Sequence, residues 1–230
     1  RYFASQKTGL SNFFRYFNYH PKSAWLFDIG GFVLNINDCI IKRRSVRKFI
    51  QTKINRELLI KLVNAARFAP SASNLQPMKF LIVDEKKLVD KVFELVKWAG
   101  YIAPHGNPKK GEEPVAYIII LADTEIRKNG YEHDAGAAGQ NIILTATEEG
   151  LGSCWIRSID RKSMRDLFSI PDNLEIDTII ALGYPAEEPV AEDYQNSIKY
   201  YKDEKGIVHV PKRNLEDILY VNKIPACKNS

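Results

Sequence analysis

The apolar run at residues 115–121, "VAYIIIL", constrains the fold more than any other stretch of the chain. Its β-branched and aromatic residues, with no charge among them, predict a strand in the protein core. A chain of 230 residues, of which 45% are hydrophobic, can surround such a strand with a full core. Length alone is compatible with one large domain or two small ones.

Helical and strand patterns alternate around this run from Asn35 onward and indicate one α/β domain. Further strands are predicted at residues 80–83, 153–156 and 177–185. Helices are predicted at residues 38–44 with Asp38 as the N-cap, at 55–69 with Asn55 as the N-cap, and at 88–98, 134–150 and 161–168. The polar segment at residues 185–205 is expected to wrap the surface.

Charge and aromatic content separate residues 1–37 from the rest. They contain four Lys and Arg against one Asp, whereas the remaining residues contain 29 against 27 Asp and Glu. This nearly equal number of positive and negative side chains argues against a dedicated nucleic-acid surface on the main body. Residues 1–37 also contain ten of the 25 aromatic residues. We interpret them as an aromatic-rich arm that packs on the main domain, residues 38–230, or on a partner subunit, with a membrane-surface helix as the alternative.

The sparse cysteines limit the compartment and the chemistry. Cys39, Cys154 and Cys227 are widely spaced, which favours free thiols in a reducing compartment, and we expect a cytoplasmic protein. The histidines lack metal-ligand spacing, so no metal site is predicted. No apolar run has the roughly 18 residues that a membrane span needs.

The basic stretch "RRSVRKF" at residues 43–49 is the first candidate site. Guanidinium groups and a serine hydroxyl suit phosphate oxygens, although a solvated helix end has the same composition. A second basic pair, Lys212 and Arg213, could converge with it on one phosphate. The chain lacks GxGxxG after a strand, GxxxxGK[ST] and GxSxG, which argues against a Rossmann site, a P-loop and a hydrolytic nucleophile.

Two more stretches have a composition that suits a ligand. The loop "PSASNLQP" at residues 70–77 places hydrogen-bonding side chains between two prolines, which suits the polar edge of a heterocycle and a polyol chain; an ordinary turn is the alternative. The helix "DAGAAGQNIILTATEEG" is expected to be capped by Asp134 and opens with small residues at 136–139. Because glycine costs about 1 kcal/mol in a helix, we expect another backbone or a flat ligand to come close there, or a helix crossing within one subunit.

Together these stretches resemble the nitroreductase-like family of FMN-dependent oxidoreductases. The motifs "RRSVRKF", "APSASNLQPMKFLIV" and "DAGAAGQNIILTATEEGLGSCWI", followed by Lys212 and Arg213, occur in the family's order over about residues 36–224. The resemblance implies an α+β fold with a central, mostly antiparallel sheet flanked by helices. It also implies an intertwined homodimer with FMN at the subunit interface, in which the small-residue helix packs against its symmetry mate.

The resemblance implies FMN contacts from both subunits. Arg47 would lie near N1 and C2=O of the flavin, the basic pair near the phosphate, and the loop at residues 70–76 would come from the other subunit. The residues at positions 154–156 would line one face of the ring. The full set of expected cofactor-binding residues is Arg43, Arg44, Ser45, Arg47, Pro70, Ser71, Ala72, Ser73, Asn74, Gln76, Cys154, Trp155, Ile156, Lys212 and Arg213.

The implied function is ping-pong electron transfer from NAD(P)H, through FMN, to a small organic acceptor such as a nitroaromatic compound or a quinone. No side chain is an evident acid or base catalyst. Trp155 and Arg157 stand where some nitroreductases have a proline and an acidic residue, so dehalogenation, enone reduction or flavin fragmentation is an alternative. A flavin-binding protein with little turnover is another. The resemblance implies that the loop at residues 98–114 covers the flavin, where Trp98 and Tyr101 could stack on a flat acceptor; a solvated surface loop without a role is the alternative.

Overall fold

The computed structural model describes residues 35–224. The aromatic-rich arm expected at residues 1–37 therefore lies almost entirely outside the described residues, as does Cys227. The α-helices of the described part are α1 (Ile36–Lys42), α2 (Arg56–Arg67), α3 (Lys86–Glu94), α4 (Glu132–Glu148) and α5 (Arg161–Phe168). Its strands are β1 (Phe49–Ile50), β2 (Met78–Val83), β3 (Ala116–Asp123), β4 (Gly152–Ile156), β5 (Leu174–Pro185), β6 (Val190–Asp193), β7 (Tyr201–Lys202) and β8 (Val208–Lys212).

The main sheet has five strands, and all of its strand pairs are antiparallel, so the α+β fold expected from the sequence is confirmed. β5 is the central strand: β3 pairs along one edge, β4 along the other, and β1 near its end. β5 begins earlier than predicted, at Leu174, because its pairing with β3 continues past an irregularity between Ile120 and Leu121.

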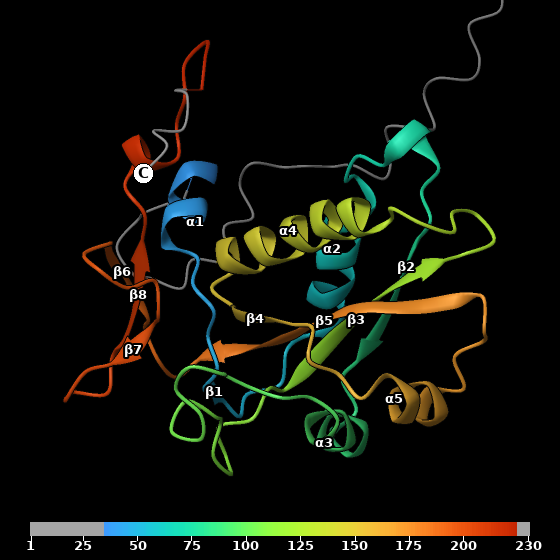
Figure 1. Ribbon diagram of the computed structural model, residues 1–230. Coiled ribbons are helices and arrows are strands. Elements are labelled where there is room, and N and C mark those ends of the chain that lie inside the picture. The colour runs from blue at the N-terminus through green and yellow to red at the C-terminus, as the bar shows by residue number, and fades with distance from the viewer. Residues whose placement is uncertain (1–34, 225–230) are drawn as a thin grey trace, which may run out of the picture. The chain divides into compact units, whose positions relative to one another are not determined.

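Both faces of the main sheet are covered by helices. Tyr117 and Ile119 of β3 lie in a buried cluster with residues of α3 and α5, whereas Ile118 and Ile120 lie in a second cluster with residues of α2 and α4. Figure 1 shows α2 and α4 on one side of the sheet and α3 and α5 on the other. The core strand predicted at residues 115–121 is confirmed, and each fully buried isoleucine contributes roughly 1.5–3 kcal/mol.

Several helix ends in the structure differ from the predicted ones by two or more residues. α1 is capped by Asn35, whose side chain accepts a hydrogen bond from the N–H of Asp38 at 3.0 Å, so Asp38 is not the cap. Asn55 caps α2 as predicted. α3 ends at Glu94 and does not reach residue 98, because the chain then turns to form a bridge between Val96 and Ile159. α4 begins at Glu132, which places Asp134 inside its first turn.

Residues 185–205 do more than wrap the surface. They contribute β6 and β7 to a three-stranded sheet in which β8 is the central strand, paired parallel to β6 and antiparallel to β7. This small sheet matters for the site because β8 ends at Lys212, one of the two basic residues expected on a phosphate.

The close contact expected at the small-residue opening of α4 lies within the subunit. A Cβ atom at Gly139 would lie 2.4 Å from Cη2 of Trp155, so the indole ring of β4 packs directly on the backbone of α4. A Cβ atom at Gly136 would meet no atom within 4 Å. The glycine at position 139 therefore makes room for a flat side chain of the same chain, and the packing of α4 against a symmetry mate stays a prediction.

These two glycines should respond oppositely to the same substitution. We expect Gly139→Ala to destabilise the protein by about 1–3 kcal/mol, because the added methyl group has to displace Trp155 from a filled space. Gly136→Ala should be neutral or stabilising by up to about 1 kcal/mol, because it only raises helix propensity. Urea unfolding followed by circular dichroism measures both, and equal effects at the two positions would contradict the packing described.

His209 connects the three strands of the small sheet. Its Nδ1 lies 2.9 Å from Oε2 of Glu192 in β6, and its Nε2 lies 3.3 Å from Oδ2 of Asp203, directly after β7. Its ring also stacks on Tyr201 of β7, with the ring centroids 5.0 Å apart. The hydrogen bonds to Asp203 and Glu192 raise the pKa of His209 above its usual value.

This arrangement predicts a pH-dependent contribution to stability. Because the pKa of His209 is raised on folding, its contribution is fully present below the ordinary pKa of about 6.5 and is lost as the pH rises through the folded-state pKa. The difference in Tm between wild type and His209→Asn should therefore be larger at about pH 6 than at about pH 9. A difference in Tm that is the same at both pH values would contradict the arrangement.

Candidate functional site

Arg43, Arg44 and Lys212 form a cationic cluster where the end of α1 meets β8 (Figure 1). Burial lowers the pKa of Lys212, and the charges of Arg44 and Arg43 lower it further. Burial and then Arg43 lower the pKa of Arg44, whose Nε is buried without a hydrogen-bond partner. No salt bridge among residues 35–224 includes any of the three. Partly desolvated cations without a counterion suit a bound anion such as a phosphate.

The chain that follows the cluster is held against the main sheet. Ser45 forms a bridge with Ser153 of β4, and the N–H of Arg47 donates to Oε1 of Glu187 at 2.7 Å. The guanidinium of Arg47 lies 5.0 Å from the ring of Tyr200, and its Nε is buried without a partner. The backbone of Arg47 is thus fixed, while its side chain keeps an unpaired donor.

Lys212 and Arg213, which were expected on the same phosphate, point to different surroundings. Lys212 belongs to the cationic cluster, whereas the guanidinium carbon of Arg213 lies 5.3 Å from the ring centroid of Tyr194. The N–H of Tyr194 also donates to the carbonyl of Lys212 at 2.7 Å. The structure therefore places only Lys212 with the two arginines.

The three neighbours at residues 154–156 alternate between the two faces of the sheet. Cys154 and Ile156 are buried in the cluster formed with α3 and α5, and burial raises the pKa of Cys154 to about 11, which keeps its thiol protonated at neutral pH. Trp155 packs on the opposite face, beside α4, and is the partly exposed member of the three. The side chains of these residues do not line one common surface.

The loop at residues 70–77 has a backbone that few sequences adopt. Ser73, Asn74 and Gln76 have φ angles of 51°, 55° and 52°, a left-handed conformation that costs residues other than glycine roughly 1–3 kcal/mol each. Ser71 Oγ accepts a hydrogen bond from the N–H of Gln76 at 3.0 Å, and Nε2 of Gln76 donates to the carbonyl of Asn74 at 3.1 Å. Backbone of this kind clusters at ligand-binding loops.

Asp134 joins this loop to α4. Its Oδ1 accepts a hydrogen bond from the N–H of Ala72 at 3.2 Å, and its Oδ2 accepts one from Arg127 at 2.8 Å. The residue is 5% exposed. Its expected role as a helix cap is wrong, because α4 starts at Glu132 and turns the carboxylate of Asp134 toward the loop. Arg127 carries no motif, and sequence reasoning missed it.

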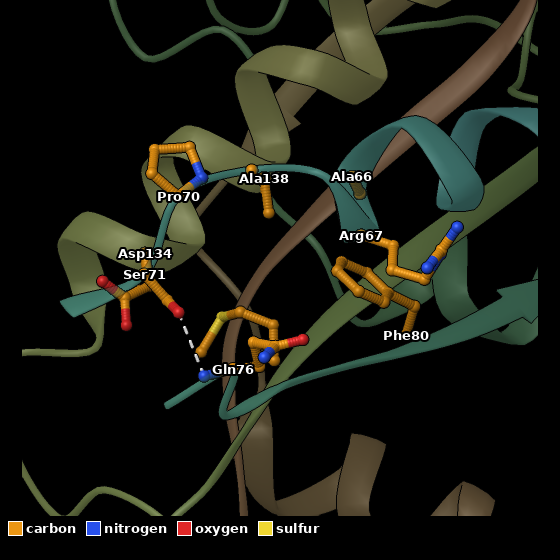
Figure 2. A pocket seen from close by; sticks show the side chains of 10 residues that line it. Ala66, Arg67, Pro70, Ser71, Gln76, Phe80, Asp134 and Ala138 are labelled. Carbon is orange, nitrogen blue, oxygen red and sulfur yellow. Dashed lines mark hydrogen bonds between the residues drawn. The ribbon is translucent and has the colours of Figure 1, made fainter. Parts of the chain in front are cut away.

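A cavity of about 130 Å³ lies beside the loop. Figure 2 shows Pro70, Ser71 and Gln76 on its loop side, with Asp134 and Ala138 of α4 and Phe80 of β2 around it. The dashed line marks the hydrogen bond between Ser71 and Gln76. A lining that is mostly apolar with a few polar groups suits a ring with a polar edge.

The cationic cluster and the loop lie at opposite ends of α4 (Figure 1). Ala72 is hydrogen-bonded to the first turn of α4, whereas α1, which leads into the cluster, packs beside its last turn. There, burial and then the charge of Glu148 raise the pKa of Cys39. The 17 residues of α4 span about 25 Å at a rise of 1.5 Å per residue. One chain therefore does not bring both halves of the expected site to one small ligand.

The loop between α3 and β3 presents one of its two expected aromatic residues. Trp98 is 8% exposed and packs on Phe93 in the core, with the ring centroids 5.8 Å apart, so its expected stacking role is wrong. Tyr101 is 57% exposed and its ring centroid lies 5.1 Å from that of Tyr200. Tyr200 was missed because it lies in the segment expected only to wrap the surface.

The described residues provide neither a membrane-spanning helix nor a metal centre. Within residues 35–224, no helix is both long and apolar enough to cross a membrane. The same part of the chain holds no group of three or more His, Cys, Asp or Glu side chains placed to bind a metal ion. Cys39 and Cys154 are buried free thiols.

Comparison with known proteins identifies relatives across most of the chain. Residues 40–184 match the Nitroreductase family. A relative from Methanothermobacter thermautotrophicus, named as an NADH dehydrogenase/NAD(P)H nitroreductase, is 34% identical over 166 residues, covering 70% of this chain and 82% of its own. A relative from Thermotoga neapolitana, named iodotyrosine deiodinase, is 28% identical over 163 residues, covering 64% of this chain and 87% of its own.

Solved structures of related proteins share this fold. The solved structure of an FMN-dependent nitroreductase from Clostridium difficile R20291 matches with a TM-score of 0.61 at 28% identity, covering 81% of this chain and 98% of that one. The family match includes the basic stretch at residues 43–49, the loop at 70–77 and the strand β4, and it ends before Lys212. From its motifs, its antiparallel sheet between two helix layers and these matches, the chain belongs to the nitroreductase family.

Proposed function

We propose that this protein is an FMN-dependent oxidoreductase that takes electrons from NAD(P)H and delivers them to a small organic acceptor, such as a nitroaromatic compound or a quinone. The observation that carries the proposal is the cationic cluster of Arg43, Arg44 and Lys212, which has no counterion within the described chain. A relative named as an NAD(P)H nitroreductase and a solved FMN-dependent nitroreductase support it. FMN, when bound, would supply the redox chemistry in two half-reactions.

The residues of the site fit the parts of FMN. Arg43, Arg44 and Lys212 would bind the terminal phosphate through charge-assisted hydrogen bonds, one of them from the unpartnered Nε of Arg44. Arg47 would direct its own unpaired donor to the pyrimidine edge, where a cation stabilises the negative charge that reduction develops. The loop at residues 70–76 would supply hydrogen bonds to the ring and the polyol chain.

Two copies of the chain would complete each site in a homodimer. The cluster and the loop are separated by the length of α4, so the loop of one subunit would serve the cluster of the other. An exposed apolar set on α1 and around the 3-10 helix η3 (Leu215–Asp217) supports a subunit interface. Its members are Ile36, Ile40, Ile41, Leu215, Ile218, Leu219, Tyr220, Val221 and Ile224.

The cofactor and its reduction test the proposed function. We expect FMN, at one molecule per subunit, to be released from the purified protein and identified by mass. Anaerobic NADH or NADPH should bleach the bound flavin, and menadione should restore its colour. FAD in place of FMN, or no flavin, would contradict the proposal. Bound FMN that neither NADH nor NADPH reduces would indicate a flavin-binding protein with little turnover.

Mixing defective subunits tests whether the site is shared. One variant combines Arg44→Ala with Lys212→Ala, and the other combines Ser71→Ala with Gln76→Ala. Each homodimer should bind FMN poorly. In a mixed dimer, one site carries both defects and the other carries none, so FMN binding should recover to about half a molecule per subunit. No recovery in confirmed mixed dimers would show that each site belongs to one chain.

The relative named iodotyrosine deiodinase favours reductive dehalogenation as a second candidate activity. Iodide release from an iodophenol by the reduced protein would support it.

We place the enzyme in the cytoplasm, because buried free thiols at Cys39 and Cys154 suit a reducing compartment.

A further inference from the structure

Tyr200 and Tyr101 form an aromatic pair beside Arg47. The ring of Tyr200 covers the guanidinium of Arg47, 5.0 Å from its carbon. The two tyrosine rings lie 5.1 Å apart and are tilted by 57°. The N–H of Tyr101 also approaches the hydroxyl of Tyr200 at 3.4 Å, so the contact includes the backbone of the loop.

The pair joins two segments that are far apart in sequence. Tyr101 lies in the loop between α3 and β3, whereas Tyr200 directly precedes β7. Nζ of Lys202 lies 3.4 Å from the carbonyl of His105, which gives a second contact between the same segments. Tyr200 is partly buried and contacts Arg47, whereas Tyr101 is 57% exposed. The ring of Tyr101 therefore faces solvent while it packs on the partly buried ring of Tyr200.

An exposed aromatic ring of this kind suits a flat apolar partner. Aromatic rings attract each other in offset or tilted arrangements at centroid separations of about 4.5–7 Å, beyond the effect of area burial. A compact, highly charged acceptor gains nothing from such a surface. Arg47 would contact the flavin in the proposed function, and Tyr200 contacts both Arg47 and Tyr101, so a molecule stacked on Tyr101 would be held on the Arg47 side of the site.

We propose that Tyr101 and Tyr200 form an acceptor-binding wall that selects planar aromatic electron acceptors over compact ones. This inference rests on the proposed function and adds the two residues that would determine which acceptors the same site binds. Tyr101 would contact the acceptor directly, and Tyr200 would hold Tyr101 in place against Arg47. The two residues determine specificity, and neither takes part in proton or electron transfer.

Reoxidation of the flavin tests the wall. The FMN-loaded protein is reduced with dithionite without oxygen and mixed with menadione or with ferricyanide in a stopped-flow instrument. Tyr101→Leu should slow reoxidation by menadione about three- to tenfold, the range expected for one lost ring contact. Reoxidation by ferricyanide should be unchanged. Tyr101→Phe keeps the ring and should behave as wild type. Tyr200→Leu should match Tyr101→Leu with menadione.

A binding measurement supplies a second readout. The dissociation constant of oxidised holoprotein for menadione, followed through the flavin spectrum, should rise about three- to tenfold in Tyr101→Leu and stay unchanged in Tyr101→Phe. The proposal would be wrong if Tyr101→Leu left both the kinetics and the binding of menadione unchanged. It would also be wrong if reoxidation by ferricyanide slowed as much as reoxidation by menadione. Reduction with dithionite makes this result independent of NAD(P)H. Normal FMN content with bleaching by NAD(P)H would then leave the proposed function intact.

Discussion

Replacing both Arg44 and Lys212 with alanine should remove nearly all FMN from the purified protein. Each side chain is expected to lose a charge-assisted hydrogen bond worth about 1.5–3 kcal/mol, so the pair should weaken FMN binding by about 10²–10⁴-fold. Quenching of FMN fluorescence during titration of the apoprotein measures the loss. The Tm of the apoprotein should not fall, because the substitutions remove partly buried cations that repel each other and Arg43.

Two controls show whether the phosphate is the group recognised. Riboflavin lacks the phosphate, so the double variant should bind it as well as the wild type does. Arg213→Ala removes the neighbouring charge, which lies over Tyr194, and should have a much smaller effect than Lys212→Ala. An equal loss of riboflavin and FMN binding would show that Arg44 and Lys212 do not bind the phosphate. Equal effects of the two single variants would refute the separation of Lys212 from Arg213.

Asp134→Ala should give the largest loss of stability among single substitutions at the site. It removes the acceptor of the Ala72 N–H and leaves Arg127 partly buried without its carboxylate. Breaking a buried charge pair from one side costs about 3 kcal/mol or more. The loop at residues 70–77 should also lose its left-handed conformations, because they persist only where the surrounding structure holds them. Chemical unfolding gives the free energy, and hydrogen exchange at the N–H of Ala72 reports the loop.

Matched variants separate the two functions of this carboxylate. Asp166→Ala removes a carboxylate from an exposed pair with Lys162 and should change stability by less than about 1 kcal/mol. Asp134→Asn keeps an acceptor for the loop and should preserve the protection of Ala72 better than Asp134→Ala does. If Asp134→Ala and Asp166→Ala had the same small effect, the contacts to Ala72 and Arg127 would not hold the loop.

Local signals in the sequence were sufficient to predict the five α-helices, strands β2 to β5 and the family, but not β1 or the small sheet of β6, β7 and β8. The run at residues 115–121 could be predicted as a core strand, because it is short, apolar on both faces and rich in β-branched and aromatic side chains. Asn55 could be predicted as a helix cap because its side chain accepts a hydrogen bond from the N–H of Glu57, only two residues away. The motifs at residues 43–49, 70–77 and 134–156 each retain their order and spacing, and these were enough to imply the family that the comparisons confirm.

The expectations that failed depend on partners distant in sequence. Asp134 was read as a cap because its real partners, the N–H of Ala72 and Arg127, are joined to it only by the fold. The contact of Gly139 with Trp155 was missed because Trp155 comes from the next strand. Trp98 was read as exposed because the turn that buries it against Phe93 follows a helix that ends early.

The sequence by itself determined the presence of the five α-helices and of strands β2 to β5, the family, and the stretches that carry the candidate site. Only the tertiary structure decided which side chain within each stretch faces the site: Lys212 joins the cationic cluster while Arg213 turns to Tyr194, and Tyr200 covers Arg47. It also placed the cationic cluster and the loop at opposite ends of α4. The physical reason is that local backbone preferences fix an element's type, whereas the direction and partners of its side chains follow from packing between elements far apart in the chain.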